Sequence, residues 1–593
     1  MKETMISLRR LFGYTGKDKP KLVLSIILII VATATMALNP YFIGLVITEL
    51  SQNVMDIANG VSGAAINFPY ILRMIVVLLI FSTIVQLTFF FSNYVMTGVV
   101  QKTMLRLRNE LAEKLNRLPM AFFDGHLQGD LLSRVTNDVD TIAMAMQQSI
   151  LQLVMSIFNI GFSVVMMFVI SIKLALVGVA IIPLCFAIIA FWTRRSQKSF
   201  QALQDELGDM SSIVQETFNG FSVVKLYGKE EDYSQAFEQT NQRLAAAGRR
   251  ATLMSGLSNP TVGSMINMGY IVMSMWGASM VFAGQLSIGN LQAVAQYLWQ
   301  IFSPISQIAQ LMAPLQAAAA SVVRVFDILD EKEESQDVEK LLLPKHIRGE
   351  VQFDDIHFGY TPDRAVIDGF SLDVQPGQTI AIVGPTGVGK TTIANLLLRF
   401  YELDSGHIKI DGIDIADMTR QQLRSLIGVV PQDPWLYHAN IEENLRFGKL
   451  EADHQEIVEA AHTANVDSYI RRLEQGYDTM LNAEASNISQ GQKQLMTIAR
   501  ALIADPPIMI LDEATSSVDT RLELLIQRTM QKAMKGRTSF VIAHRLSTIR
   551  EADIILVMQD GNIAEQGQHN ELLARGGYYA SLYNSQFGGG MTE

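Results

Sequence analysis

Long apolar runs alternate with polar segments over the first 315 residues of the chain. Because a helix needs about 20 mostly apolar residues to cross a bilayer, the pattern predicts six transmembrane spans. Their approximate ranges are 22–47, 71–100, 146–171, 174–193, 255–283 and 288–315. Residues 48–70 contain no Lys or Arg, whereas residues 101–118 contain five. The positive-inside rule therefore places the N-terminus and residues 101–118 in the cytoplasm.

Two polar intervals, residues 101–145 and 194–252, are too long for simple loops. They contain few Gly or Pro and carry apolar residues at helical spacing, with short irregular spots at 118–125 and 218–221. This pattern predicts that helices extend from the membrane into the cytoplasm. Two such intervals on the same side favour a docking role for their turns, although solvated helical loops are the alternative.

The pattern changes after residue 315 and becomes typical of a soluble α/β domain from Val351 onward. Short apolar strands alternate with helical stretches. The expected strands read VQFDDIHF, TIAIVG, HIKIDG, LIGVVP, PIMILDEA, TSFVIAH and DIILVM. We therefore predict an all-α membrane domain of six helices with long cytoplasmic extensions, joined to an α/β P-loop domain. The predicted boundaries are residues 1–335 for the membrane domain, 336–350 for a linker, 351–587 for the nucleotide-binding domain and 588–593 for a tail.

Composition supports a membrane protein and excludes some other classes. The 593 residues are 49% hydrophobic with a mean hydropathy of +0.21, which is too apolar for an ordinary soluble protein. The net charge of −11 argues against a nucleic-acid binder. The single cysteine, Cys185, excludes an intramolecular disulfide and a cysteine-based zinc site. We expect a multi-pass protein of the cell membrane with a cytoplasmic nucleotide-binding domain.

A glycine-rich turn between a predicted strand and a predicted helix carries the clearest chemistry. The spacing Gly384-x4-Gly389-Lys390-Thr391 is that of a phosphate-binding loop, in which glycines let backbone N–H groups point at phosphates. Lys390 reaches the β- and γ-phosphates, and the Thr391 hydroxyl is a Mg²⁺ ligand. ATP and Mg²⁺ are therefore the expected cofactors. The residues expected to hold the nucleotide here are Gly384, Pro385, Thr386, Gly387, Val388, Gly389, Lys390, Thr391 and Thr392.

Further short motifs surround this loop in a fixed order. They are HFGY with Tyr360, VVPQD with Gln432, ISQGQ at 488–492, ILDE with Asp512 and Glu513, SSVD with Asp519, and FVIAHR with His544. With these motifs, the whole chain resembles a half-transporter of the ABC exporter superfamily, whose six-helix membrane domain precedes its ATP-binding cassette. The resemblance implies an ATPase that drives movement of substances across the membrane, working as a dimer.

The resemblance assigns a role to each matching residue. Tyr360 stacks on adenine, and Gln432 contacts Mg²⁺ and the attacking water. Asp512, which follows an apolar strand, holds Mg²⁺ through water, and Glu513 polarises the water for attack on the γ-phosphate. His544 contacts the γ-phosphate. Asp519 belongs to the loop that crosses the dimer interface.

The segment at 487–492 occupies the family's signature position, usually LSGGQ, where it closes over the γ-phosphate bound by the partner. Ser489, Gly491 and Gln492 are retained, but Gln490 replaces the first glycine. The phosphate loop, Glu513 and His544 are all present. The combination of these residues with a non-standard signature resembles bacterial heterodimeric multidrug exporters, in which one of the two composite ATP sites is degenerate. We therefore favour a heterodimer with a second half-transporter chain, while a homodimer with a tolerated Gln490 is the alternative.

The same resemblance gives the cytoplasmic turns a coupling role. Residues 122–129 are expected to dock mainly on the partner's nucleotide-binding domain, and residues 217–221 on one of the two domains. Closure of the ATP-bound domains then turns the membrane helices outward-facing.

The spans contain almost no ionisable residue, which argues against a dedicated site for a strongly charged solute. Soft and amide side chains gather in the last two spans, where they either line an adaptable cavity or face lipid and neighbouring helices. They are Met265, Met268, Tyr270, Met273, Met275, Trp276, Gln292, Gln296, Tyr297, Trp299, Gln300, Gln307 and Gln310. We predict multidrug-type efflux of hydrophobic or amphiphilic compounds; the alternatives are a dedicated lipid or lipopeptide exporter and an ATP-gated regulatory membrane protein.

Overall fold

The protein is described here by a computed structural model. The structure describes residues 9–335, 343–344, 346–361, 364–385, 387–512, 520–543, 546–560 and 562–587. The chain forms two compact units. One comprises Met1–Asn116 and Gln128–Glu331, and the other comprises Arg117–Leu127 and Lys332–Glu593. The predicted tail and residues 336–342 of the predicted linker lie outside the described residues.

Six helical stretches of the first unit are long and apolar enough to cross a membrane, counted over the described residues. This agrees with the six predicted spans. The helices that contain them are α2 (Lys19–Met36), α3 (Asn39–Ala58), α4 (Phe68–Leu115), α8 (Ile150–Ile170), α9 (Ile172–Asn219), α12 (Ser258–Phe282) and α13 (Ile288–Asp330).

The first span is interrupted between α2 and α3, where Pro40 lies in the first turn of α3. Proline suits this position because backbone N–H groups in the first turn of a helix have no carbonyl partner within that helix, so the missing N–H of proline costs no hydrogen bond. A few residues further along α3, Gly44 lies against Gly289 of α13 so closely that a Cβ on Gly289 would be 1.7 Å from the Gly44 carbonyl oxygen. Small residues thus allow the backbones of α3 and α13 to touch, as is common between membrane helices.

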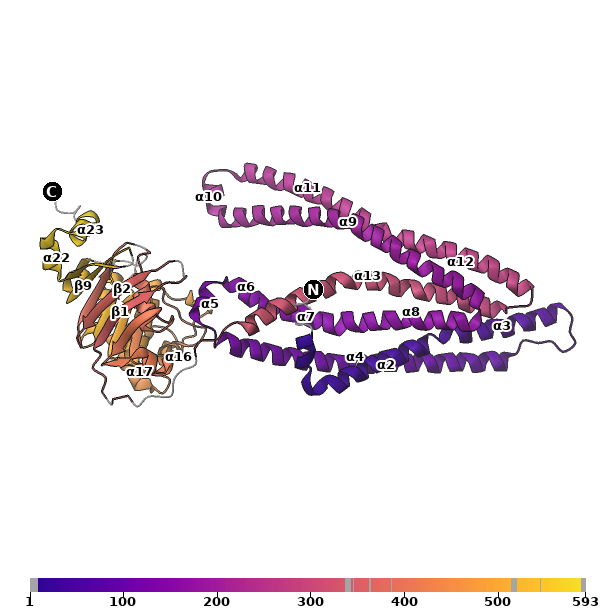
Figure 1. Cartoon of the computed structure of the whole chain (residues 1–593), viewed down its shortest axis with the longest axis horizontal. Coiled ribbons are helices and arrows are strands. Elements are labelled where there is room, and N and C mark those ends of the chain that lie inside the picture. The colour runs from indigo at the N-terminus through magenta and orange to yellow at the C-terminus, as the bar shows by residue number, and fades with distance from the viewer. Residues whose placement is uncertain are drawn as a thin grey trace. The chain divides into compact units, whose positions relative to one another are not determined.

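The predicted cytoplasmic helical extensions are confirmed. Helix α4 continues to Leu115 and α9 continues to Asn219. Helices α9 and α11 (Glu230–Gly256) run side by side and are joined by the short α10 (Phe221–Leu226), as Figure 1 shows. The predicted irregular spots correspond to Pro119, just before α5 (Met120–Asp124), and to Gly220 between α9 and α10.

A polar cluster fixes the extension of α13 in the first unit. The chain before α8 forms α6 (Gln128–Ser133) and α7 (Val139–Met144), with π-helical turns at Arg134–Asp138 and Ala145–Ser149. Asp138 is buried, and its carboxylate accepts hydrogen bonds from Arg324 Nε at 2.8 Å and from Ser321 Oγ at 2.8 Å. Burial opposes ionisation of Asp138, but these donors outweigh it and hold the pKa of Asp138 below its usual value.

We expect Asp138→Asn to destabilise the membrane unit by about 1–2 kcal/mol, because the buried donors lose a charged acceptor. Since the folded pKa is lowered, the stabilisation is present above about pH 4 and is lost as the pH falls below the unfolded value. Thermal unfolding of the detergent-solubilised chain at several pH values measures both effects. Asp140→Asn is the control, since this exposed carboxylate pairs with the exposed Arg108. Equal shifts for the two variants would contradict the assignment.

The second unit contains two sheets. A four-stranded antiparallel sheet has the order β2 (Ile367–Val374), β1 (Val351–Phe358), β4 (Ser405–Ile410) and β5 (Ile413–Asp414). A six-stranded sheet has the order β10 (Asn562–Gly567), β9 (Ile554–Gln559), β3 (Thr379–Val383), β8 (Thr538–Ile542), β7 (Ile508–Asp512) and β6 (Ile427–Val430). Its strands are parallel except for β10.

Both faces of the parallel sheet are buried, because successive side chains of β3 pack alternately in two different hydrophobic cores. Ile380 and Ile382 pack in a core shared with the antiparallel sheet, whereas Ala381 and Val383 pack in a second core with the helices on the other face. The helices of this unit include α14 (Lys390–Leu397), α15 (Arg420–Ser425), α16 (Ile441–Arg446), α17 (His454–Thr463), α18 (Asp467–Ile470), α19 (Gln490–Ile503), α20 (Thr520–Met534), α21 (Leu546–Glu551), α22 (His569–Arg575) and α23 (Tyr578–Phe587).

Candidate nucleotide site

The predicted phosphate loop connects β3, in the middle of the parallel sheet, to the N-terminus of α14. Gly387 and Gly389 adopt φ values of 83° and 102°, which residues with a side chain rarely adopt. A Cβ on Gly384 would lie 2.5 Å from the carbonyl oxygen of Met558. Glycine is therefore required at these positions for the tight path of the loop, and the loop leads into a helix N-terminus that favours anions.

Lys390 is buried beneath this loop. Its ammonium donates hydrogen bonds to the carbonyl oxygens of Gly384 and Pro385 at 2.7 and 2.8 Å. Burial lowers the pKa of Lys390, and the nearby carboxylate of Asp512 acts in the opposite direction. The structure thus brings Asp512, at the end of β7, close to the lysine of the loop.

The other described candidates lie at the carboxyl ends of the parallel strands, where open α/β sheets bind ligands. Gln432 follows β6 and is exposed, and Thr391 is exposed in the first turn of α14. Thr386, Glu513, Asp519 and His544 lie outside the described residues. The order of the strands still brings the ends of β6, β7 and β8 to one edge beside the loop after β3.

Tyr360 belongs to an aromatic cluster beside the phosphate loop. Its hydroxyl forms a hydrogen bond with the Thr392 hydroxyl at 3.0 Å, and its ring meets the Tyr401 ring edge-on at 5.0 Å. Tyr360 remains 48% exposed, so a face of the ring is open to a base. This geometry suits the stacking role that the sequence predicts for Tyr360.

The signature segment forms the N-terminus of α19. Ser489 is the N-cap residue, and its backbone N–H donates to Gln492 Oε1 at 3.0 Å. Ser489 and Gln490 are exposed, whereas Gly491 is buried. A 14-residue helix thus presents its N-terminus and a serine hydroxyl to the surface, an arrangement that can bind an anion.

Two residues that the sequence analysis did not single out connect the signature helix to the loop after β6. Arg500 donates to the carbonyl oxygens of Asn444 and Trp435, both at 2.9 Å. The buried Gln494 donates to the Pro431 carbonyl oxygen at 3.3 Å, next to Gln432. Polar residues on the otherwise apolar face of α19 are the sequence signal that could have identified them.

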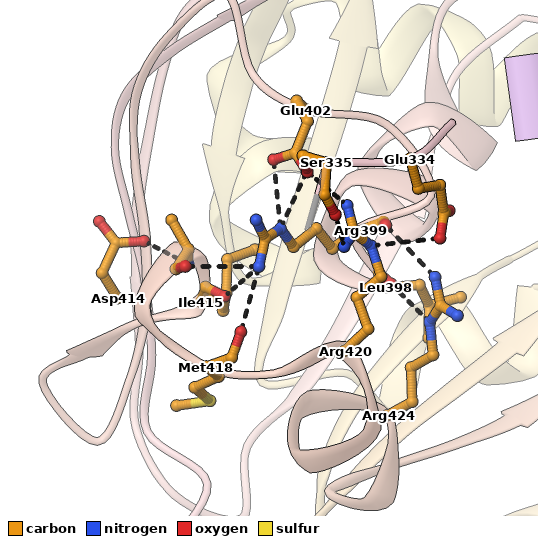
Figure 2. Close-up of polar contacts among 11 residues, drawn as sticks. Glu334, Ser335, Leu398, Arg399, Glu402, Asp414, Ile415, Met418, Arg420 and Arg424 are labelled. Atoms are coloured by element: carbon orange, nitrogen blue, oxygen red, sulfur yellow. Dashed lines mark hydrogen bonds and ion pairs between the residues drawn. The ribbon is translucent and has the colours of Figure 1, made fainter. Parts of the chain in front are cut away.

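Tyr401 and Glu402, just after α14, contact α5 and Ser335, which belong to the two places where the chain passes from one unit to the other. The Tyr401 hydroxyl donates a hydrogen bond to Asp124 of α5, and burial together with Asp124 raises the pKa of Tyr401. Glu402 accepts hydrogen bonds from Arg399, Arg420 and Ser335 (Figure 2). Within the chain, α5 contacts Tyr401. The docking of residues 122–129 on the partner's domain stays a prediction.

These features define a P-loop ATPase of the ATP-binding cassette type fused to a six-helix membrane domain. ATP and Mg²⁺ fit the residues present, because Gly387 and Gly389 adopt left-handed φ values, Gly384 lies close to Met558, and Lys390 lies under the loop with Asp512 nearby. When bound, Mg²⁺ neutralises developing charge on the phosphates.

Comparison with known proteins supports this class of protein. Residues 22–305 match the ABC transporter transmembrane region and residues 367–516 match the ABC transporter model. The chain is 46% identical to a fatty acid ABC transporter ATP-binding/permease protein of Mycobacterium bovis, over 88% of this chain and 83% of the relative. It is 39% identical to the uncharacterized ABC transporter ATP-binding protein YfiC of Bacillus subtilis, over 99% and 95%. It is 33% identical to an ATP-dependent lipid A-core flippase of Syntrophus aciditrophicus, over 84% and 85%. The chain belongs to the ABC transporter family.

Proposed function

We propose that this protein uses ATP hydrolysis to export hydrophobic or amphiphilic compounds across the cell membrane, as one half of a dimer. The observation that carries the proposal is a membrane domain with uncharged polar contacts between its spans, fused to a cassette with a complete phosphate loop. Gln152 donates to Gln307 Oε1 at 2.6 Å, and Ser163 donates to Gln300 Oε1 at 3.4 Å, both between α8 and α13. Uncharged polar groups among apolar spans suit a mostly apolar substrate with a small polar group.

Lipid-like amphiphiles are the first candidates for the substrate. One relative is named a fatty acid transporter and another a lipid A-core flippase. Multidrug efflux is the second candidate, supported by exposed soft and aromatic side chains of α12 such as Met268, Met275 and Trp276. These side chains can adapt to several ligands.

For the chemical step we assign Glu513 as the general base, His544 as the γ-phosphate contact and Gln432 as the group that orients the water. Thr391 and Asp512 hold Mg²⁺, and Tyr360 stacks on adenine. The support is the motif order together with the position of the described members around the carboxyl ends of β3, β6 and β7. Tyr401 and Asp124 then connect the site mechanically to α5.

The substrate can be tested with the purified transporter in nanodiscs of phosphatidylcholine. We expect a long-chain fatty acid anion to stimulate ATPase activity in the nanodiscs. With the same transporter reconstituted inside-out in sealed vesicles, we expect this anion to accumulate in the vesicles only with ATP. Ethidium tests the multidrug candidate in the same assays. Stimulation by ethidium alone would make multidrug efflux the function, and ATPase activity indifferent to both classes would contradict the proposal.

We further propose that the partner is a different half-transporter chain, because Gln490 stands in the signature. The native mass and ATPase activity of the chain, expressed alone and with the product of a neighbouring transporter gene, test this point. Activity confined to the mixed dimer is expected. Full activity of the chain alone would mean that the signature with Gln490 works and that the heterodimer proposal is wrong.

A further inference from the structure

A surface cleft in the membrane unit lies between α9 and α11, away from the nucleotide site. It has a volume of about 700 Å³, within the range of about 300–1,000 Å³ typical of small-molecule sites. Helices α9 and α11 pack side by side along their length, so the cleft is formed by one compact part of the fold. Its lining shares no residue with the α8–α13 contacts of Gln152 with Gln307 and of Ser163 with Gln300.

One end of the cleft is strongly basic. Its charged lining residues are Arg194, Arg195 and Lys198 of α9 and Arg250 of α11. The sequence of α9 contains no Asp or Glu from 172 to 204, and that of α11 contains none from 239 to 256. The nearest acidic residues further along α9 are Asp205 and Glu206, and Glu206 is paired with Arg243 at 3.0 Å. The four cations therefore form a cluster with no acidic residue within residues 172–204 of α9 or 239–256 of α11, which favours an anion.

The other end of the cleft is apolar. Ala187, Ala190 and Phe191 line it on α9, and Met254 lines it on α11. Phe191 is 63% exposed, so a large apolar surface is available to a ligand. The small alanines leave room beside the ring. A molecule that fits this cleft has an anionic head and an apolar chain.

The cleft lies where the fourth span leaves the membrane. The apolar run of α9 ends at Trp192, and Arg194 begins the cytoplasmic extension. Tryptophan and arginine are typical of the membrane–water interface, and an amphiphile in the cytoplasmic leaflet places its head at that level. The basic end of the cleft thus faces the head-group level while the apolar end lies deeper.

We propose that this cleft binds a single-chain anionic amphiphile from the cytoplasmic leaflet, with its carboxylate among Arg194, Arg195, Lys198 and Arg250 and its acyl chain along Ala190 and Phe191. This rests on the proposed function and deepens it by naming fatty acid anions as the class of substrate that the chain recruits. One narrow apolar wall suits one acyl chain, and a carboxylate matches the arginine guanidinium groups in shape and charge.

The test uses a photoreactive palmitate analogue with the full-length transporter in phosphatidylcholine nanodiscs. Arg250 lines the cleft, whereas its neighbour Arg249 does not, so Arg250→Gln and Arg249→Gln form a matched pair that removes the same charge. We expect Arg250→Gln to raise the half-saturating palmitate concentration about fivefold and Arg194→Gln/Arg250→Gln to raise it at least about tenfold. Arg249→Gln should change it less than about twofold, and basal ATPase activity should be unchanged in all variants.

Mass spectrometry of the labelled protein should place the cross-links on residues 187–199 and 250–254. Equal effects of Arg249→Gln and Arg250→Gln would overturn the proposal, because the cations would then act only through general surface charge. Equal competition by phosphatidylglycerol would also overturn it, since the cleft would then hold membrane head groups. Labelling of the cleft together with ATPase activity that neither palmitate nor ethidium stimulates would support the site but would refute the proposed function. Stimulation that persists unchanged in Arg194→Gln/Arg250→Gln would refute the site and leave the proposed function standing.

Discussion

Glu513→Gln should reduce steady-state ATP turnover by at least about a hundredfold while ATP binding is retained. A positioned general base typically contributes about 10²- to 10⁴-fold to a rate, and glutamine keeps the size of the side chain but cannot accept the proton. Phosphate release and equilibrium binding of a fluorescent ATP analogue, both on the purified dimer, measure the two quantities separately. Glu474→Gln is the control, since this exposed glutamate lies on the same domain outside the proposed site.

Unchanged turnover in Glu513→Gln would mean that another group activates the water. A loss of turnover that comes entirely from lost ATP binding would show a structural effect at the end of β7. In either case the assignment of Glu513 as general base would be wrong, whereas the phosphate loop itself would not be challenged.

Lys390→Ala should weaken ATP binding by about 10- to 100-fold. A charge-assisted hydrogen bond to phosphate contributes about 1.5–3 kcal/mol, and about 1.4 kcal/mol corresponds to a tenfold change in affinity. Lys390 also donates to the carbonyl oxygens of Gly384 and Pro385, so its removal loosens the loop that surrounds the phosphates. Titration of the same ATP analogue measures the affinity.

Lys409→Ala is the control for Lys390→Ala. Lys409 lies on β4 of the antiparallel sheet, with its ammonium 3.8 Å from Asp354, and is outside the predicted loop. We expect its replacement to leave ATP affinity within about twofold, because an exposed ion pair contributes little. Retained affinity in Lys390→Ala would contradict the role of the loop in binding phosphate.

Seven of the strands could be predicted from the sequence, and those with a continuous apolar pattern gave the clearest signal. TIAIVG and PIMILDEA correspond to β3 and β7, each buried on both faces. The apolar pattern did not predict β2, β5 and β10. Along β10 no residue is fully buried, and β5 has only two residues, so neither carries a local apolar signal. These strands form because a neighbouring strand supplies hydrogen bonds, which the local sequence does not encode.

The same distinction applies to the candidate site. The phosphate loop is recognisable because its glycines, lysine and threonine are neighbours in the chain, and the backbone φ values of Gly387 and Gly389 agree with the need for glycine there. Tyr401 lies in an ordinary stretch after α14, and its contact with Asp124 joins residues 277 positions apart. No periodicity or short motif in the sequence predicts a contact between two such distant residues.

The sequence by itself determined the six spans, the orientation in the membrane, the cytoplasmic helical extensions and the ATP-binding loop. Each of these depends on local properties: the length of apolar runs, the distribution of cations, and the conformational freedom of closely spaced glycines. The tertiary structure decided the order of the strands, the docking of α5 on Tyr401 and the joining of Arg194 with Arg250 in one cleft. These features depend on side chains far apart in the chain, and only packing of the folded helices and strands brings them together.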